Sequence, residues 1–230
     1  MDACLIISRF DEDLDWLKKY SNYKVIIYNK GNEINYDYFK NIIKLENVGR
    51  ESHTWLHHIV SNYNNLNEIN IFLQGRIDDL GCMAYKDPQQ YINKIDRFGF
   101  SASRYGLLGP LHWSRNIGIE NDKRYKKAWI NKEISRSEIG FRKFSKNILP
   151  DIPYFVSTSY GGCFAVKKEK IYRHNIEFYK YLLNILNKHK NPIEGHYLER
   201  LWCYIFTKNA TIYQSYFDIL LTKFEKLLPY

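Results

Sequence analysis

The chain has 230 residues, a formal net charge of +9, and aromatic side chains at 17% of its positions. This length suits one domain that buries its core without disulfides, and no two cysteines form a CxxC pair, which argues against a structural zinc site. The basic residues are scattered rather than gathered in a tail for nucleic acid, and no apolar run approaches the ~18 residues that cross a membrane. Since the N-terminus carries no signal-peptide pattern, we expect a cytoplasmic protein of the producing or host cell that is not secreted.

The first 75 residues alternate between strand-like and helix-like segments. Short apolar runs at 3–8, 24–28 and 69–73 predict buried strands, and the apolar stripe along 51–63 predicts a helix. The acidic run 11–13 favours another helix start, because acidic side chains suit the first helical turn. This order predicts an α/β fold with a mostly parallel, Rossmann-like central sheet flanked by helices.

The middle of the chain, from about residue 85 to 153, predicts irregular loops that either serve an active site or lack order. Regular structure is predicted again at 154–157 and 161–166, followed by three helices with apolar stripes, the last over 217–228. No repeat or linker divides the chain, so we expect one domain, 1–230. Its expected parts are a nucleotide-binding half (1–80), variable loops (81–153), and acceptor-side and closing helices (154–230).

Polar side chains, with the aromatic ring of Phe10 among them, follow the ends of the three predicted N-terminal strands. Ligands of open parallel sheets bind beyond the carboxyl ends of the strands, so these residues are candidates for a binding site. They are Ser8, Arg9, Phe10, Asn29, Lys30, Gln74, Arg76, Asp78 and Asp79. Cations suit phosphate, whereas carboxylates suit Mg²⁺ or Mn²⁺. Asp78 and Asp79 are therefore the predicted metal ligands, with an ordinary turn pair as the alternative.

Gly49 and Arg50 precede the predicted helix at 51–63. A helix start binds anions through free N–H groups and its positive dipole end. Gly49 permits a close backbone approach to a ligand, and Arg50 grips an oxyanion through two parallel hydrogen bonds. His53, near the helix start, is within reach of the same ligand. The alternative is an ordinary helix cap at this position.

Two further histidines lie on this helix. His57 lies on the flank of the apolar stripe and is interpreted as a structural residue with satisfied hydrogen bonds, while His58 is expected to face away from the stripe. A zinc-protease helix needs Glu after the first His, and Thr54 occupies that position.

Candidate residues for the second substrate come later. Gly161 and Gly162 precede a predicted strand and permit tight approach to an acceptor, or form a simple turn. Glu194 is placed where a loop carboxylate acts as a catalytic base. Glu199 lies at the edge of an apolar stripe, where burial with a partner and catalysis are both open.

Several segments together resemble a known group of proteins. They are Ser8-Arg9-Phe10-Asp11-Glu12-Asp13-Leu14, Tyr28-Asn29-Lys30-Gly31, Asn47-Val48-Gly49-Arg50-Glu51-Ser52-His53-Thr54-Trp55-Leu56 and Phe72-Leu73-Gln74-Gly75, with Gly161-Gly162-Cys163-Phe164-Ala165-Val166 and Glu199-Arg200-Leu201-Trp202 later. The chain resembles the small GT-A-type glycosyltransferase domains of large DNA viruses, which decorate capsid glycans. It also resembles a fungal, algal-virus and bacterial family of unknown function. The resemblance covers residues 3–80 and omits the middle of the chain.

The resemblance implies a GT-A fold, a nucleotide-diphosphate sugar donor, and a divalent metal near an Asp-x-Asp motif. It places Ser8, Arg9 and Phe10 near the nucleotide base, Arg50 near the diphosphate, and the 161–162 glycines near the acceptor. The chain departs from the motif, because its two aspartates at 78 and 79 are adjacent.

These observations together predict a hexosyl- or deoxyhexosyltransferase. It would use a UDP- or GDP-linked sugar with Mn²⁺ or Mg²⁺ and modify a glycan or protein-glycan acceptor. Asp79 would hold the metal, and Glu194 would deprotonate the acceptor if the reaction inverts; a retaining reaction needs no such base. Two alternatives stay open, a nucleic-acid-binding module and a metal-dependent phosphohydrolase. We expect no nucleic-acid partner and no membrane span, and peripheral membrane contact is compatible with the basic charge.

Overall fold

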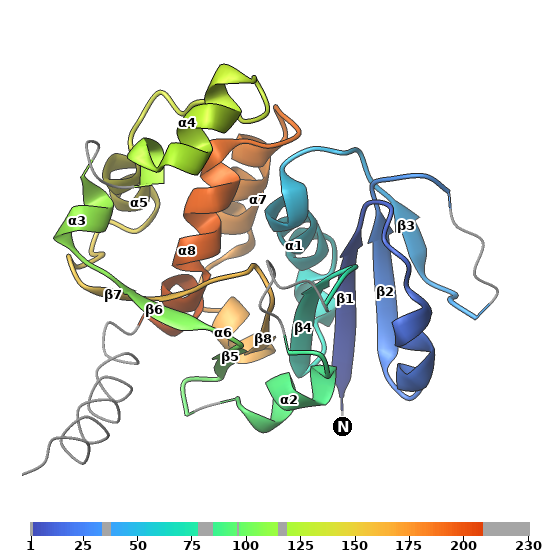
Figure 1. The fold of residues 1–230 in the computed structure, drawn as a ribbon. Helices are drawn as coiled ribbons and strands as arrows, with labels where there is room; N and C mark the ends of the chain where they lie inside the picture. The colour runs from blue at the N-terminus through green and yellow to red at the C-terminus, as the bar shows by residue number, and fades with distance from the viewer. Residues whose placement is uncertain (1, 34–37, 78–84, 96, 115–118, 209–230) are drawn as a thin grey trace, which may run out of the picture.

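The computed structural model describes residues 2–33, 38–77, 85–95, 97–114 and 119–208, which form a mixed α/β fold (Figure 1). Its main sheet has the strand order β3-β2-β1-β4-β8-β5. The strands are β1 (Ala3–Arg9), β2 (Lys24–Asn29), β3 (Ile42–Lys44), β4 (Ile69–Gln74), β5 (Phe100–Ala102) and β8 (Phe164–Lys167). The first four run parallel, and β8 pairs antiparallel with both β4 and β5. The predicted α/β class with a mostly parallel central sheet flanked by helices is confirmed.

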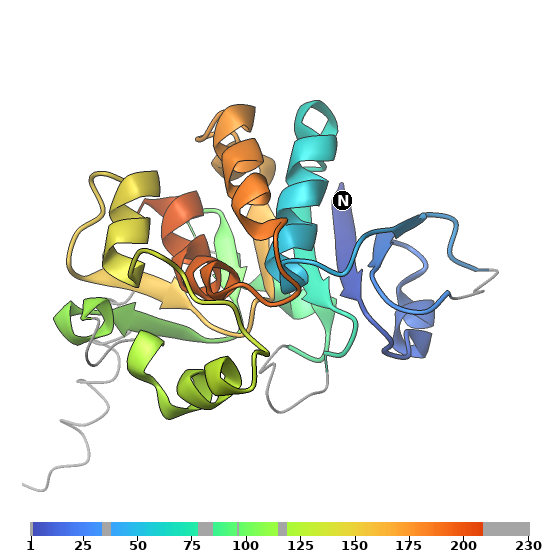
Figure 2. The same ribbon diagram turned by 90° about the horizontal axis from the view of Figure 1, so that it is seen from above.

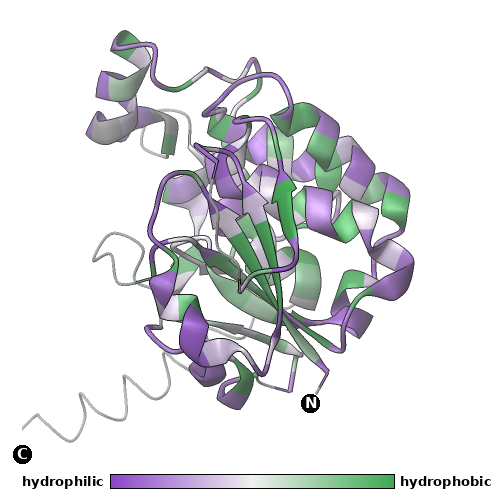
Figure 3. Ribbon diagram, turned by 90° about the vertical axis from the view of Figure 1, so that its right-hand side faces the viewer, coloured by the Kyte–Doolittle hydropathy of each residue, from purple (hydrophilic) through white to green (hydrophobic). Residues whose placement is uncertain are grey.

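The two faces of the sheet carry separate apolar cores, because successive side chains of a strand point to opposite faces. Leu5 and Ile7 of β1 pack beneath η1 (Asp15–Tyr20) and α2 (Pro88–Asn93). Cys4 and Ile6 of the same strand face the larger core, which is covered by α1 (Arg50–Ser61), α7 (Ile176–Leu186) and α8 (Ile193–Thr207). Figure 2 shows α1 and α7 side by side, and Figure 3 shows how strongly apolar the central strands are.

The middle of the chain is more regular than the sequence predicts. The antiparallel strands β6 (Tyr105–Leu108) and β7 (Val156–Ser159) form a second sheet beside α8. The short helices of this region are α3 (Pro110–Trp113), α4 (Lys123–Ile130) and α5 (Phe141–Ile148), with the 3-10 turn η3 (Ile119–Asn121). Outside it, the 3-10 turn η2 (Tyr63–Asn65) lies between α1 and β4, and the short helix α6 (Lys168–Ile171) follows β8. The prediction of irregular loops is wrong for α5, whose apolar residues Phe141, Phe144 and Ile148 pack into the larger core.

Further predictions from the sequence concern the helix start at the acidic run, the C-terminal helix and membrane spans. The acidic run before η1 leads into a 3-10 helix, and the short strand β3 was not predicted. Cys4 and Cys163 are buried free thiols. The last predicted helix, 217–228, lies outside the described residues. No helix among the described residues combines the length and apolarity that crossing a membrane requires.

His58 corrects the expectation that its side chain faces away from the core. The side chain is 2% exposed, and its Nδ1 lies 3.0 Å from the hydroxyl of Tyr28. The reason is that α1 is covered on two sides, by the sheet and by α7, so a single apolar stripe underestimates its burial. Burial lowers the pKa of His58 to about 3. His57 is half-buried, and its Nδ1 has no hydrogen-bond partner among the described residues, contrary to the predicted satisfied state.

Candidate functional site

A cavity of about 230 Å³ opens at the carboxyl ends of β1, β2 and β4, beside the start of α1. We call it the rim cavity. Its lining residues are Ser8, Arg9, Phe10, Glu12, Lys30, Asn47, Arg50, Glu51 and Gln74. The fold therefore brings together six of the residues predicted to bind the donor, from four separate segments of the chain. Three of them are cations, and two carboxylates lie among them.

Arg9 is buried at the end of β1 and holds the surrounding loops. Its Nε donates to the carbonyl of Glu12 at 2.9 Å, and its Nη1 donates to the carbonyl of Phe10 at 2.9 Å and to Asn29 Oδ1 at 2.7 Å. Nη1 also donates to the carbonyl of Asn32 at 3.0 Å. Nη2 has no partner among the described residues and is the guanidinium nitrogen left for a ligand. Asn29 does not line the cavity and instead orients Arg9.

Lys30, directly after β2, is 8% exposed and lies under the start of α1. Its Nζ donates to the carbonyls of Val48 and Arg50, each at 2.6 Å, and lies 3.4 Å from His53 Nδ1. Burial lowers the pKa of Lys30 to about 7, although Glu51 acts in the opposite direction. Because these groups surround Nζ, Lys30 makes no separate ligand contact, and with a pKa of about 7 it contributes a partial positive charge to the cavity at neutral pH.

The turn before α1 places Arg50 at the cavity. Gly49 and Arg50 both have left-handed backbones, with φ of 62° and 51°. Their N–H groups donate to the carbonyls of His189 at 2.8 Å and Lys190 at 3.2 Å, so these two amides are not open to an anion as predicted. The Arg50 side chain is 38% exposed and lies between Glu51 (Nε to Oε2, 3.3 Å) and the ring of His196. The pKa of Arg50 is raised, chiefly by the adjacent carboxylate of Glu51.

Two other donor-site predictions at this turn need correction. Gly49 allows a close approach to His53 and Leu186 rather than to a ligand, since an added Cβ would lie 2.6 Å from His53 Cβ and 2.9 Å from the Leu186 carbonyl. His53 is buried and does not line the rim cavity. Burial, reinforced by the charge of Lys30, lowers the pKa of His53 to about 3, so the ring is neutral.

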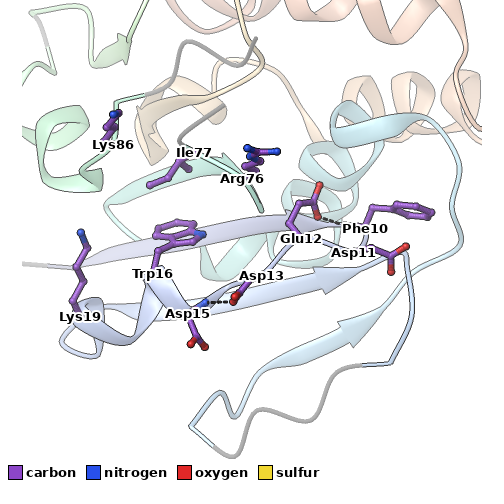
Figure 4. A pocket seen from close by; sticks show the side chains of 10 residues that line it. All are labelled: Phe10, Asp11, Glu12, Asp13, Asp15, Trp16, Lys19, Arg76, Ile77 and Lys86. Carbon is purple, nitrogen blue, oxygen red and sulfur yellow. Dashed lines mark hydrogen bonds between the residues drawn. The ribbon is translucent and has the colours of Figure 1, made fainter. Parts of the chain in front are cut away.

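A second cavity, of about 690 Å³, adjoins the first and shares Phe10 and Glu12 with it (Figure 4). We call it the large cavity. The loop after β1 and η1 supply one wall, which includes Trp16, and the segment that follows β4 supplies Arg76 and Ile77. Trp16 Nε1 donates to the carbonyl of Gly75 at 2.7 Å, which ties the two walls together. Predicted donor-site residue Arg76 therefore lies in this cavity rather than at the rim.

The glycines predicted to lie near the acceptor form a turn beside the rim cavity. Gly161 and Gly162 have φ of 89° and 67°, a conformation that favours glycine. The Gly161 carbonyl accepts from Gln74 Nε2 at 3.3 Å, and the Gly162 carbonyl accepts from Trp55 Nε1 at 3.0 Å. A Cβ on Gly162 would lie 3.2 Å from the side chain of Glu51. The turn thus packs against two side chains that line the cavity.

Glu199 of α8 holds the same turn from the opposite side. Its Oε1 accepts from the N–H of Gly161 at 3.0 Å, and its Oε2 lies 3.8 Å from His196 Nδ1. Burial acts to raise the pKa of Glu199, but the His196 ring, the charge of Arg200 and the Gly161 amide outweigh it and lower the pKa to about 2. The carboxylate is therefore ionised.

The predicted base Glu194 lies away from this site. Glu194 lines a separate cavity of about 480 Å³ between α5, α7 and the start of α8, together with residues such as Tyr181 and Lys188. Asp78 and Asp79 lie outside the described residues. Among the described residues, no group of three or more His, Cys, Asp or Glu side chains is placed to hold a metal ion. The rim cavity supplies two carboxylates, Glu12 and Glu51, which are oxygen ligands of the type that Mg²⁺ and Mn²⁺ accept.

Sequence reasoning missed three contributors to the site. The sequence presents Glu12 as part of an acidic helix start, although it follows Phe10 by two residues and so lies close to the same strand end. Its carboxylate accepts from the N–H of Phe10 at 2.6 Å and packs against Gly75. Glu51 follows Arg50 at the start of the helix and was not among the predicted site residues. His196, 146 residues after Arg50, has no sequence signal that links the two.

The chain was also compared with known proteins. Residues 5–218 match the family described as protein of unknown function (DUF3431). The chain belongs to this family. No curated protein and no solved structure matches the chain. The family description names no activity, so the function of this DUF3431 member has to be argued from its own cavities.

Proposed function

We propose that the protein is a GT-A-type glycosyltransferase that takes a sugar from a nucleotide-diphosphate sugar. The observation that carries the proposal is the pair of adjoining cavities beyond the carboxyl ends of β1, β2 and β4. Ligands of open α/β sheets bind at this position, and the large cavity of about 690 Å³ falls within the usual size range for small-molecule sites. Membership in a family of unknown function neither adds to this proposal nor weakens it.

The residues that line the two cavities suit different parts of a nucleotide, which supports a nucleotide as the ligand. In the large cavity, Phe10 and Trp16 offer aromatic faces on which a base stacks, and Arg76 adds a cation. The smaller rim cavity supplies Arg9, Lys30 and Arg50 around a space suited to a diphosphate. Both cavities meet at Phe10 and Glu12, where the ribose would lie.

The proposed reaction forms a bond between an acceptor hydroxyl oxygen and the anomeric carbon of the sugar. The bond from that carbon to the diphosphate oxygen breaks, and the nucleoside diphosphate leaves with the electron pair and its added negative charge. Arg50, with the buried charges of Arg9 and Lys30, stabilises this charge. A bound Mn²⁺ or Mg²⁺ would neutralise the same leaving group, with Glu12 and Glu51 near it and Asp78–Asp79 as the proposed main ligands. The hydroxyl proton would pass to a base; Glu194 was predicted for this role and lies on a separate cavity.

A thermal-shift experiment tests the class of ligand. We expect UDP or GDP with Mn²⁺ to raise the melting temperature, because a ligand at about 100 times its dissociation constant adds roughly 2.7 kcal/mol of stability. Arg50→Lys keeps the charge but loses the planar two-point grip, so the shift should shrink while the melting temperature of the free protein stays the same. Stabilisation by oligonucleotides alone, in a salt-sensitive way, would favour the nucleic-acid-binding alternative instead.

A further inference from the structure

Two segments at one end of the β6–β7 sheet expose large apolar side chains. Leu108 of β6 pairs with Val156 of β7. Helix α3 therefore follows β6 at the end where Tyr154 and Phe155 lead into β7. Leu111 of α3 is 64% exposed, Tyr154 61% and Phe155 56%. We call these three side chains the apolar tip; Figure 1 and Figure 2 both place α3 at the end of the molecule opposite β3.

The apolar tip stands on buried contacts. Trp113 of α3 is buried, and its ring stacks on Phe141 of α5 with centroids 4.9 Å apart. Its Nε1 donates to the carbonyl of Tyr154 at 2.6 Å, which ties α3 to the segment before β7. Gly109 lies against the ring of Phe155, since an added Cβ on Gly109 would lie 3.2 Å from it. The exposed side chains therefore project from a packed base.

Basic side chains of α5 border the apolar tip. The Arg142 guanidinium lies 4.7 Å from the ring centre of Trp113 and 4.4 Å from that of Tyr154. Its two Nη atoms donate to backbone carbonyls just before Tyr154, at 3.0 and 3.2 Å. Lys146, one turn further along α5, is exposed and donates to the carbonyl of Pro150 at 2.7 Å. Within the described part of the chain, both cations pair with carbonyls and rings rather than with a carboxylate, so their charge is not neutralised.

The charge around the apolar tip is positive. Residues 109–114 contain no Lys, Arg, Asp or Glu, and residues 141–155 contain three cations and one carboxylate. They are Arg142, Lys143, Lys146 and Asp151. We call the three cations the basic border, and their sign agrees with the net charge of +9. A second copy of the chain would meet this surface with like charge, whereas an anionic surface would meet it with opposite charge.

We propose that the apolar tip and the basic border dock the protein on an anionic lipid bilayer. Aromatic and leucine side chains suit the boundary between lipid headgroups and acyl chains, while adjacent Lys and Arg side chains reach the headgroup phosphates. Each side chain of the tip is more than half exposed, which fits a projecting surface that a bilayer accepts without a shaped partner. The docking does not rest on the proposed function, because it requires neither a nucleotide nor a metal.

Co-sedimentation of the full chain with lipid vesicles tests the docking. One set of vesicles contains phosphatidylcholine alone, and the other contains equal amounts of phosphatidylcholine and phosphatidylglycerol. We expect stronger binding to the second set, because each basic side chain near an anionic surface strengthens binding about fivefold. Added salt should weaken this binding by screening the charges. No binding to the anionic vesicles at low salt, or equal binding to both sets, would overturn the proposal.

Matched variants separate this surface from the charge scattered over the rest of the chain. Leu111→Ser combined with Phe155→Ser should weaken binding to the anionic vesicles at least about tenfold, because two large apolar side chains no longer enter the bilayer. Lys146→Gln should weaken it about fivefold. Tyr181→Ser is the control: Tyr181 of α7 is 53% exposed, close to the value for Phe155, and this variant should bind as the wild-type protein does. Equal binding by the double variant and the wild-type protein, at the same melting temperature, would overturn the proposal and assign the binding to dispersed charge.

Analytical ultracentrifugation without lipid tests the competing occupant, a second copy of the chain. We expect the wild-type protein and the double variant Leu111→Ser/Phe155→Ser to sediment alike. A dimer that dissociates in the double variant would overturn the proposal and assign the apolar tip to self-association.

Discussion

Replacing Gly49 with alanine should destabilise the protein, because two separate costs meet at this position. The backbone is left-handed, with φ of 62°, which costs an L-residue about 1–2 kcal/mol. The added Cβ would also lie 2.6 Å from His53 Cβ and 2.9 Å from the Leu186 carbonyl, and overpacking of this kind typically costs about 1–3 kcal/mol. We therefore expect Gly49→Ala to lower the free energy of unfolding by about 2–5 kcal/mol.

Gly195 provides a matched control in the adjacent helix α8. A Cβ there would meet the Gly49 carbonyl at 3.7 Å and Pro192 Cγ at 4.0 Å, which are ordinary contacts. Alanine is the better helix former by up to about 1 kcal/mol, so Gly195→Ala should be neutral or stabilising.

Urea unfolding of both variants measures the difference. With a slope of about 2 kcal/mol per molar urea, the midpoint of Gly49→Ala should fall by about 1–2.5 M, while that of Gly195→Ala should stay or rise. Equal midpoints for Gly49→Ala and the wild-type protein would refute the reasoning about this turn. Since the turn carries Arg50, the destabilised variant should also bind UDP more weakly.

Three further predictions concern charge and the catalytic assignment. The pKa of Lys30 is about 7 in the folded protein and about 10.4 in the unfolded chain. Between pH 7 and pH 10, Lys30 therefore binds a proton more strongly in the unfolded chain than in the folded protein. The free energy of unfolding of the wild-type protein, measured with urea, should therefore rise from pH 7 toward pH 10 relative to that of Lys30→Met. The same pH dependence of this free energy in both proteins would contradict the prediction. The pKa of His58 is about 3 when folded against 6.5 ordinarily, so its contribution should be lost as pH falls from about 6.5 toward 3, by at most about 1.4 kcal/mol per pH unit. His58→Gln should show a flatter acid profile in the same assay; an equally steep loss would argue against this. Glu194→Gln should bind UDP as the wild-type protein does by calorimetry, because Glu194 lines a separate cavity; weaker binding would bring Glu194 into the site.

The sequence was sufficient to predict the nucleotide-binding half of the fold. Strands β1, β2 and β4 are short apolar runs, and α1 carries an apolar stripe, so local periodicity identified them. The middle of the chain was harder, because elements such as β5 and α3 have only three and four residues. Elements this short are stabilised by tertiary packing rather than by a repeating local pattern.

The candidate site was predictable where it follows strand ends and unpredictable where it depends on distant contacts. Arg9 and Lys30 were found by the rule for parallel sheets, but the sequence could not show that both are largely engaged by loop carbonyls. The contact of Arg50 with His196 joins residues far apart in the chain, so it requires the packing of α8 beside α1. Glu194 was preferred as a base because of its loop-like sequence, and the structure places it on another cavity.

The central claim is that the protein transfers a sugar from a nucleotide-diphosphate donor, and the products of donor cleavage test it most directly. A set of UDP- and GDP-sugars is incubated with Mn²⁺ and either the wild-type protein or Arg50→Ala, with water or an added glycan as acceptor. We expect that one donor yields the nucleoside diphosphate, and that Arg50→Ala loses this activity while remaining folded. Cleavage between the two phosphates, giving sugar phosphate and nucleoside monophosphate, would indicate the phosphohydrolase alternative, and no consumption of any donor would contradict the claim.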